Sequence, residues 1–181
     1  MMTEELAQSV SERLFAEEAA NVYAVLDGAS VPALLDQLYE LEPEHECLYR
    51  GELEPDLAEV APYLVCLEPD AEFTRWLLAE GWGQHWGVFL SSDADLRALR
   101  RHLRTFLVVY DPEGRPLYFR YYDPRVLRVY MPTCNAEELQ TVFGPVVSYL
   151  LEDEDPRALL RFQFMGGTLR RERHALDGDG A

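Results

Sequence analysis

The sequence contains no lysine, so all sixteen of its basic residues are arginine. Asp and Glu number 33, which gives a formal net charge of −17 at pH 7. A surface this acidic repels phosphate backbones and anionic membranes, and this argues against nucleic acid or lipid as the main ligand. Each arginine can form a planar two-point pair with a carboxylate, which a lysine cannot do.

Cysteines are few and long apolar runs are missing. Cys47, Cys66 and Cys134 form no CxxC pair and are odd in number, so no disulfide framework is predicted. The N-terminal segment is acidic and amphipathic, unlike a secretory signal, and no stretch approaches the about 18 apolar residues of a membrane span. We therefore expect a protein of the reducing cytoplasm, with no membrane partner.

The short motifs that accompany catalysis and metal binding are also missing. There is no GxSxG, HExxH, Walker or GxGxxG pattern. His45, Glu46 and Cys47 are adjacent, so in a strand they alternate between its two faces and cannot chelate one ion. The nearest glycine-rich segment, Gly81-Trp82-Gly83, lacks a phosphate-binding helix start and indicates a tight turn. We expect no catalytic residues, no metal, no cofactor and no enzymatic activity.

The length and composition predict one self-sufficient domain. The 181 residues are 48% apolar and 12% aromatic, which is enough for a buried core despite the charge. Apolar strand-like and helix-like segments alternate along the chain, and this pattern favours an α/β fold. We predict a mixed β-sheet flanked by helices, with an N-terminal helix in residues 1–20, the main domain in 21–165 and a short flexible C-terminal tail in 166–181.

Local signals predict several individual elements. The run PYLVCL at residues 62–67 is apolar enough for a central strand. The predicted helix caps are Ser30, Asp70, Ser92, Asp123 before Pro124, and Asn135, which forms a capping box with Glu138. The segments 106–110 and 117–122 are predicted to form the two strands of a hairpin. Residues 52–61 are predicted to form an acidic, proline-containing loop.

Charge is unevenly distributed along the sequence. Residues 1–90 contain nineteen acidic residues against three arginines, whereas residues 91–130 contain five against eight. On the predicted helix 92–104, four arginines share one stripe beside the apolar face: Arg97, Arg100, Arg101 and Arg104. This stripe either docks an acidic partner or pairs with acidic loops of the same chain.

A second arginine group surrounds the segment Tyr121-Tyr122-Asp123-Pro124. Arg120 and Arg125 flank the capping Asp123, and together they favour a hydrogen-bond network that fixes the turn. The alternative is a binding surface, because Tyr122 and the arginines belong to the residue types enriched at interface hot spots. The sequence leaves both interpretations open.

Five segments in order resemble a known family. They are Ala61-Pro-Tyr-Leu-Val65, Gly81-Trp-Gly-Gln-His-Trp-Gly87, Leu99-Arg-Arg-His-Leu-Arg104, Tyr118-Phe-Arg-Tyr-Tyr-Asp-Pro-Arg125 and Phe143-Gly-Pro145. Over about residues 21–165 the chain resembles the effector chaperones, or adaptors, of bacterial type VI secretion (Tap/TEC type). The resemblance implies a non-enzymatic protein of the donor cytoplasm that binds a cognate secreted effector and helps load it onto a spike of VgrG and PAAR-type proteins.

Two other functions remain as alternatives at this point. One is a small hydrolase that uses paired carboxylates from the acidic N-terminal half, and it requires two acids that converge in a pocket. The other is an acidic inhibitory protein of the immunity type, which the charge of residues 1–90 favours. The arginine stripe, Arg120, Tyr122 and Arg125 are the candidate partner-binding residues.

Overall fold

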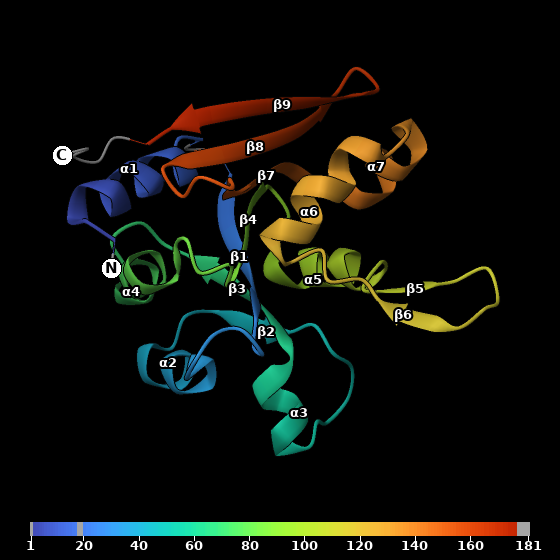
Figure 1. Ribbon diagram of the computed structural model, residues 1–181. Helices are drawn as coiled ribbons and strands as arrows, with labels where there is room; N and C mark the ends of the chain where they lie inside the picture. Colours follow the sequence, from blue (N-terminus) through green and yellow to red (C-terminus); the bar gives the residue numbers. More distant parts are fainter. Residues whose placement is uncertain (1, 18–19, 177–181) are drawn as a thin grey trace.

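The computed structural model describes residues 2–17 and 20–176 as a layered α/β structure (Figure 1). Its helices are α1 (Glu4–Leu14), α2 (Leu34–Leu41), α3 (Pro55–Val60), α4 (Glu72–Gly81), α5 (Leu96–Arg104), α6 (Pro124–Tyr130) and α7 (Ala136–Phe143), with a 3-10 turn at Met131–Thr133. Its strands are β1 (Asn21–Asp27), β2 (His45–Cys47), β3 (Pro62–Leu67), β4 (Gly87–Ser92), β5 (Val108–Tyr110), β6 (Pro116–Tyr118), β7 (Val146–Glu152), β8 (Ala158–Met165) and β9 (Thr168–Ala175).

Seven strands form the central sheet in the order β2-β3-β1-β4-β7-β8-β9, and β5 and β6 form a separate hairpin. The predicted α/β class is confirmed. The strand pairings within the described residues are all antiparallel, so the expected mixture of parallel and antiparallel strands is corrected in this respect. Antiparallel pairing brings the C-terminal end of β1 beside the start of β4, because Leu26 lies opposite Gly87.

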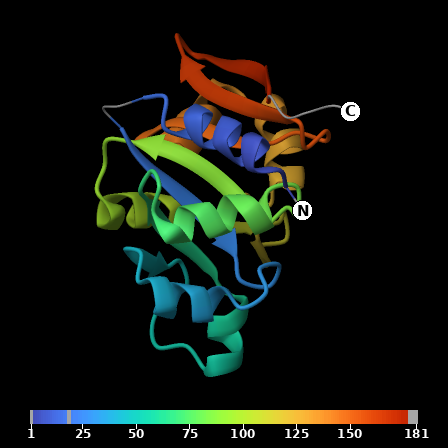
Figure 2. The same cartoon turned by 90° about the vertical axis from the view of Figure 1, so that its left-hand side faces the viewer.

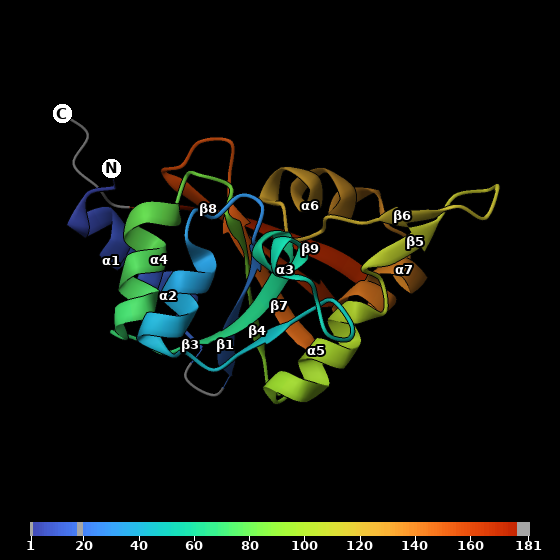
Figure 3. The ribbon, with the colours of Figure 1, turned by 90° about the horizontal axis from the view of Figure 1, so that it is seen from below.

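Helices cover both faces of the sheet (Figures 2 and 3). Successive side chains of a strand point to opposite faces. On β1, Val22, Ala24 and Leu26 face α1, α2 and α4, whereas Tyr23 and Val25 face α5, α6 and α7. The sheet is therefore apolar on both faces, and the near-continuous apolar runs of β1 and β3 follow from this double burial.

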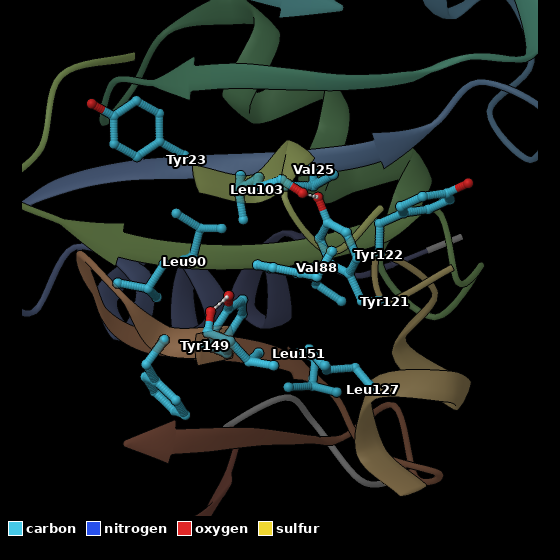
Figure 4. Packing of buried hydrophobic residues seen from close by; sticks show 14 of the residues in the cluster. Tyr23, Val25, Val88, Leu90, Leu103, Tyr121, Tyr122, Leu127, Tyr149 and Leu151 are labelled. Carbon is cyan, nitrogen blue, oxygen red and sulfur yellow. Dashed lines mark hydrogen bonds between the residues drawn. The ribbon is translucent and has the colours of Figure 1, made fainter. Parts of the chain in front are cut away.

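The core on the α5 side includes buried tyrosines whose hydroxyls have partners (Figure 4). Tyr121 is fully buried and donates a hydrogen bond to the Leu103 carbonyl at 3.1 Å. Tyr149, on β7, donates to the Val142 carbonyl at 2.8 Å. These bonds satisfy hydroxyls that would otherwise be buried without a partner, and they attach α5 and α7 to the rest of the core.

Some predicted caps are confirmed and others are wrong. Asp123 and Asn135 cap α6 and α7, and Asn135 forms the predicted capping box with Glu138. Ser30 instead donates to Asp27 at 2.8 Å, and α2 begins four residues later. Asp70 has a positive φ of 62° and precedes α4 without capping it. The cap of α5 is Asp95, because Ser92 still belongs to β4.

Two further expectations need correction. Residues 55–60, expected in a loop, form the short helix α3, which starts at Pro55. The expected flexible tail is wrong for residues 168–175, which form β9 and pair with β8 along its whole length. The last part of that expected tail, residues 177–181, lies outside the described residues, as do residue 1 and residues 18–19 of the expected N-terminal helix.

Candidate functional site: two arginine groups on one side of the sheet

Helix α5 presents the predicted arginine stripe beside a buried apolar face. Asp95 caps the helix by accepting a hydrogen bond from the Ala98 amide at 2.7 Å. Leu96, Leu99 and Leu103 are buried against the sheet, as their spacing predicts. The stripe thus lies along the boundary between the core and the surface of the protein.

Arg100 and Arg104 turn toward the chain that leaves β2. Arg100 donates to the Cys47 carbonyl at 2.8 Å, and its guanidinium lies 3.4 Å from the carboxylate of Glu46. Arg104 donates to the carbonyls of Leu48 and Tyr49, both at 2.8 Å. These two arginines supply donors to backbone carbonyls that the short strand β2 leaves unpaired, so their contacts are structural.

Arg97 and Arg101 are exposed on the same helix. Neither forms a hydrogen bond or ion pair with the described residues. The structure therefore divides the predicted stripe in two, and only this exposed pair is free to contact a partner.

Arg120 also forms a long-range contact. Its guanidinium is hydrogen-bonded to the carboxylate of Asp27, which is 2% exposed at the end of β1. Asp27 also accepts hydrogen bonds from the amide of Ala29 at 3.2 Å and the hydroxyl of Ser30 at 2.8 Å. Arg120 therefore holds the segment before α6 against the end of β1, and its contact lies outside the turn that was predicted to contain it.

Asp123 and Arg125 do form the predicted turn network. Asp123 caps α6 and also accepts hydrogen bonds from Arg125, through Nε at 3.0 Å and Nη2 at 2.8 Å. Burial alone would raise the pKa of Asp123, but the hydrogen bonds from Arg125 outweigh it and the pKa is lowered. The side chain of Arg125 remains 55% exposed, whereas Tyr122 is buried, so of these two candidates only Arg125 reaches the surface.

A pair formed by the buried Glu152 and the partly exposed His85 was not predicted from the sequence. Glu152 ends β7, and its carboxylate lies 2.6 Å from Nδ1 of His85 and accepts a hydrogen bond from the amide of Gly83. Burial raises the pKa of Glu152, although the contacts with His85 oppose the shift. The GWGQHWG segment contains half of this pair, but nothing in the sequence marks Glu152 among so many acidic residues.

Exposed apolar side chains gather on and near the β5–β6 hairpin, which extends from the body of the protein (Figure 3). Tyr110, Leu117 and Tyr118 are 70%, 50% and 65% exposed. A groove of about 300 Å³ lies between Tyr118, Leu57 of α3 and Leu107. The hairpin was predicted at residues 106–110 and 117–122, but its strands are the shorter Val108–Tyr110 and Pro116–Tyr118. The sequence alone could not show that most of their side chains are exposed.

The described residues contain no helix long and apolar enough to cross a membrane. A comparison with family models matches residues 22–141 to the domain of unknown function DUF4123. This chain belongs to the DUF4123 family. The family is known as that of type VI secretion effector chaperones or adaptors, which is the resemblance that the ordered motifs indicate. No curated protein and no solved structure matches the DUF4123 chain.

The DUF4123 match contains both arginine groups. It begins at the second residue of β1 and ends within α7, so Arg97, Arg101, Arg120 and Arg125 all lie inside it. Glu152 lies beyond the matched residues, as do β7, β8 and β9. The match therefore links the chain to a family of type VI secretion adaptors or chaperones, and it does not indicate which residues contact a partner.

Proposed function

We propose that this protein is a non-enzymatic adaptor that binds a cognate type VI secretion effector and helps load it onto a VgrG/PAAR-type spike. The observation that carries the proposal is the DUF4123 match over residues 22–141. The partners are the effector and a spike protein, and the place of action is the cytoplasm of the secreting cell.

The arginines differ in whether they have partners within the chain, and this difference supports a binding role for a few of them. Arg100, Arg104 and Arg120 are occupied by carbonyls and by Asp27, so they contribute to the fold. Arg97 and Arg101 are exposed and unpaired within the described residues. In a chain with a net charge of −17, two unpaired arginines one helical turn apart favour contact with an acidic patch of a partner.

The paired carboxylates support the non-enzymatic part of the proposal. Asp27 is bound by Arg120 and Ser30, and Asp123 by Arg125. Glu152 is bound by His85 and by the amide of Gly83. Each of these buried acids thus has hydrogen-bond partners in its own chain, which is typical of structural carboxylates.

Pairwise co-purification with the product of a neighbouring effector gene and with a spike protein tests the proposal. We expect the wild type to capture at least one of them, and the pair of changes Arg97→Glu and Arg101→Glu to weaken this capture without changing the melting temperature. Failure of the wild type to bind either protein would contradict the proposal.

Two results would favour the other functions. Turnover of a small substrate that is abolished by Glu152→Gln, with the protein still folded, would indicate a hydrolase. Protection of cells from a toxin with no effect on its secretion would indicate an inhibitory protein of the immunity type.

A further inference from the structure

The groove beside the β5–β6 hairpin combines apolar walls with arginine. Its walls include Leu48, Leu53 and Leu57 from the segment that runs from β2 into α3, and Leu107, Val108 and Tyr118 from the segment that contains the hairpin. The ring of Tyr118 packs against that of Tyr49, with centroids 5.7 Å apart, and both residues line the groove. The volume of about 300 Å³ is at the lower end of the range for ligand pockets, so it accommodates side chains and not a folded domain.

The charge of the groove is opposite to that of the whole protein. Arg50 and Arg104 line it, and of the described residues that do so none is acidic. Arg50 is exposed and forms no ion pair with the described residues. Glu52 and Glu54, on the same connection, are exposed but do not line the groove.

The positive charges of the guanidiniums near the groove also repel one another. The pKa of Arg104 is lowered, first by burial and then by the nearby charges of Arg100 and Arg50. The carboxylate of Glu46 lies 3.4 Å from the guanidinium of Arg100 and offsets part of this positive charge. Positive charge therefore exceeds negative charge at the groove, in a chain with twice as many acidic as basic residues.

We propose that this groove binds an acidic peptide segment of a partner protein, with a large apolar side chain of the segment inserted between Leu57 and Tyr118. Carboxylates flanking that side chain pair with Arg50 and with the free nitrogen of Arg104. Apolar contact supplies affinity, and the arginines select acidic over basic sequences. This inference deepens the proposed function, because it names the chemistry of the partner segment and rests on the protein being an adaptor.

Direct binding of synthetic peptides tests the groove without knowledge of the effector. The probe is a short fluorescent peptide in which Asp and Glu flank a central Phe-Leu pair. Two matched peptides carry Lys in place of the acids, or Ser in place of Phe-Leu. We expect the acidic, apolar peptide to bind the full-length protein, with an affinity that falls as the salt concentration rises, and both matched peptides to bind at least about tenfold more weakly.

Variants then locate the binding site. Arg50→Glu and Tyr118→Ser change exposed side chains, so both proteins should melt like the wild type, and both should lose at least about tenfold in affinity for the peptide. Arg13→Glu on α1 and Tyr39→Ser on α2 change exposed residues that do not line the groove and should leave affinity unchanged. No binding by the wild type, equal binding of the lysine peptide, or equal losses in the controls would overturn the inference.

Two further measurements separate this inference from the proposed function. If Arg50→Glu and Tyr118→Ser still capture the cognate effector and the spike, the groove inference fails while the adaptor function stands. If the wild type captures neither protein, the adaptor function fails, and the peptide assay still decides the chemistry of the groove. A dimer in solution that Tyr118→Ser dissociates would assign the groove to a second copy of the chain and overturn the inference.

Discussion

Arg120 binds the carboxylate of Asp27, a residue 93 positions earlier in the sequence. Asp27 ends β1 and is buried, while the side chain of Arg120 is 47% exposed. Both residues lie within the region that the family model matches, Asp27 near its start and Arg120 shortly before α6.

Removal of this contact should destabilise the fold. In Arg120→Ala, the buried carboxylate of Asp27 keeps its hydrogen bonds from the Ser30 hydroxyl and the Ala29 amide. It loses its ion pair with the arginine. We expect a loss of about 1–3 kcal/mol in the free energy of unfolding, measured with urea. Arg115→Ala is the matched control, because among the described residues Arg115 pairs with Asp111 and Glu113, both in the hairpin turn. Equal losses in the two variants would contradict a structural role for Arg120.

The arginines of α5 should separate into two classes. The double change Arg100→Ala and Arg104→Ala leaves the carbonyls of Cys47, Leu48 and Tyr49 without these donors, and should cost about 1–3 kcal/mol. Arg97→Ala with Arg101→Ala changes exposed side chains and should stay within about 0.5 kcal/mol of the wild type. Thermal and urea unfolding measure both, and similar values for the two pairs would disprove the division.

The stability supplied by Asp123 should depend on pH. Its pKa in the folded protein is below the ordinary value of 3.8, so its contribution is present above that value and is lost as the pH falls through the folded pKa. Asp123→Asn should therefore be less stable than the wild type at about pH 7, and the difference should shrink at about pH 2.5. Urea unfolding at the two pH values checks this, and a difference that does not change with pH would contradict it.

Gly144 should tolerate alanine poorly. Its φ is 47°, and an added Cβ would lie 2.3 Å from the ring of His102, which packs on Phe106. Gly144→Ala should cost about 1–3 kcal/mol for a positive-φ backbone that only glycine adopts readily, and about 1–3 kcal/mol more for displacing the ring.

Gly114 provides the matched control for that substitution. Its φ is 79°, and no atom of the described residues lies within 4 Å of an added Cβ, so Gly114→Ala carries a positive-φ backbone cost without a side-chain clash. If calorimetry gives the two variants the same melting temperature, the contact with His102 has no energetic importance.

Local elements of this protein could be predicted well from its sequence. The run at residues 62–67 and the capping box at Asn135 correspond to β3 and α7, because both depend on neighbouring residues alone. The cap of α2 was wrong because Ser30 bonds to Asp27, so a serine that suits a helix start is used in a turn. Strand β9 was missed because an edge strand rich in arginine lacks the apolar alternation by which strands are predicted.

Most residues of the site could be predicted from the sequence, but their contacts could not. The stripe on α5 followed from helical periodicity, yet only the structure shows that Arg100 and Arg104 face the carbonyls after β2. Arg120 was assigned to the wrong network because a contact over 93 positions leaves no local trace. The groove at Tyr118 combines the connection after β2, α3, α5 and the hairpin, so no single segment could indicate it.

Strands β7 and β8 lie after the residues that the family model matches, and this matters if the matched region is expressed alone. A fragment cut at the matched boundary, residue 141, would leave β4 as a bare sheet edge and strip Tyr149, Leu151 and Phe162 from the α5-side core. Such an exposed edge invites intermolecular strand pairing and insolubility. A fragment that extends to Leu176 keeps these strands, and Leu176 is itself buried on the opposite side of the sheet.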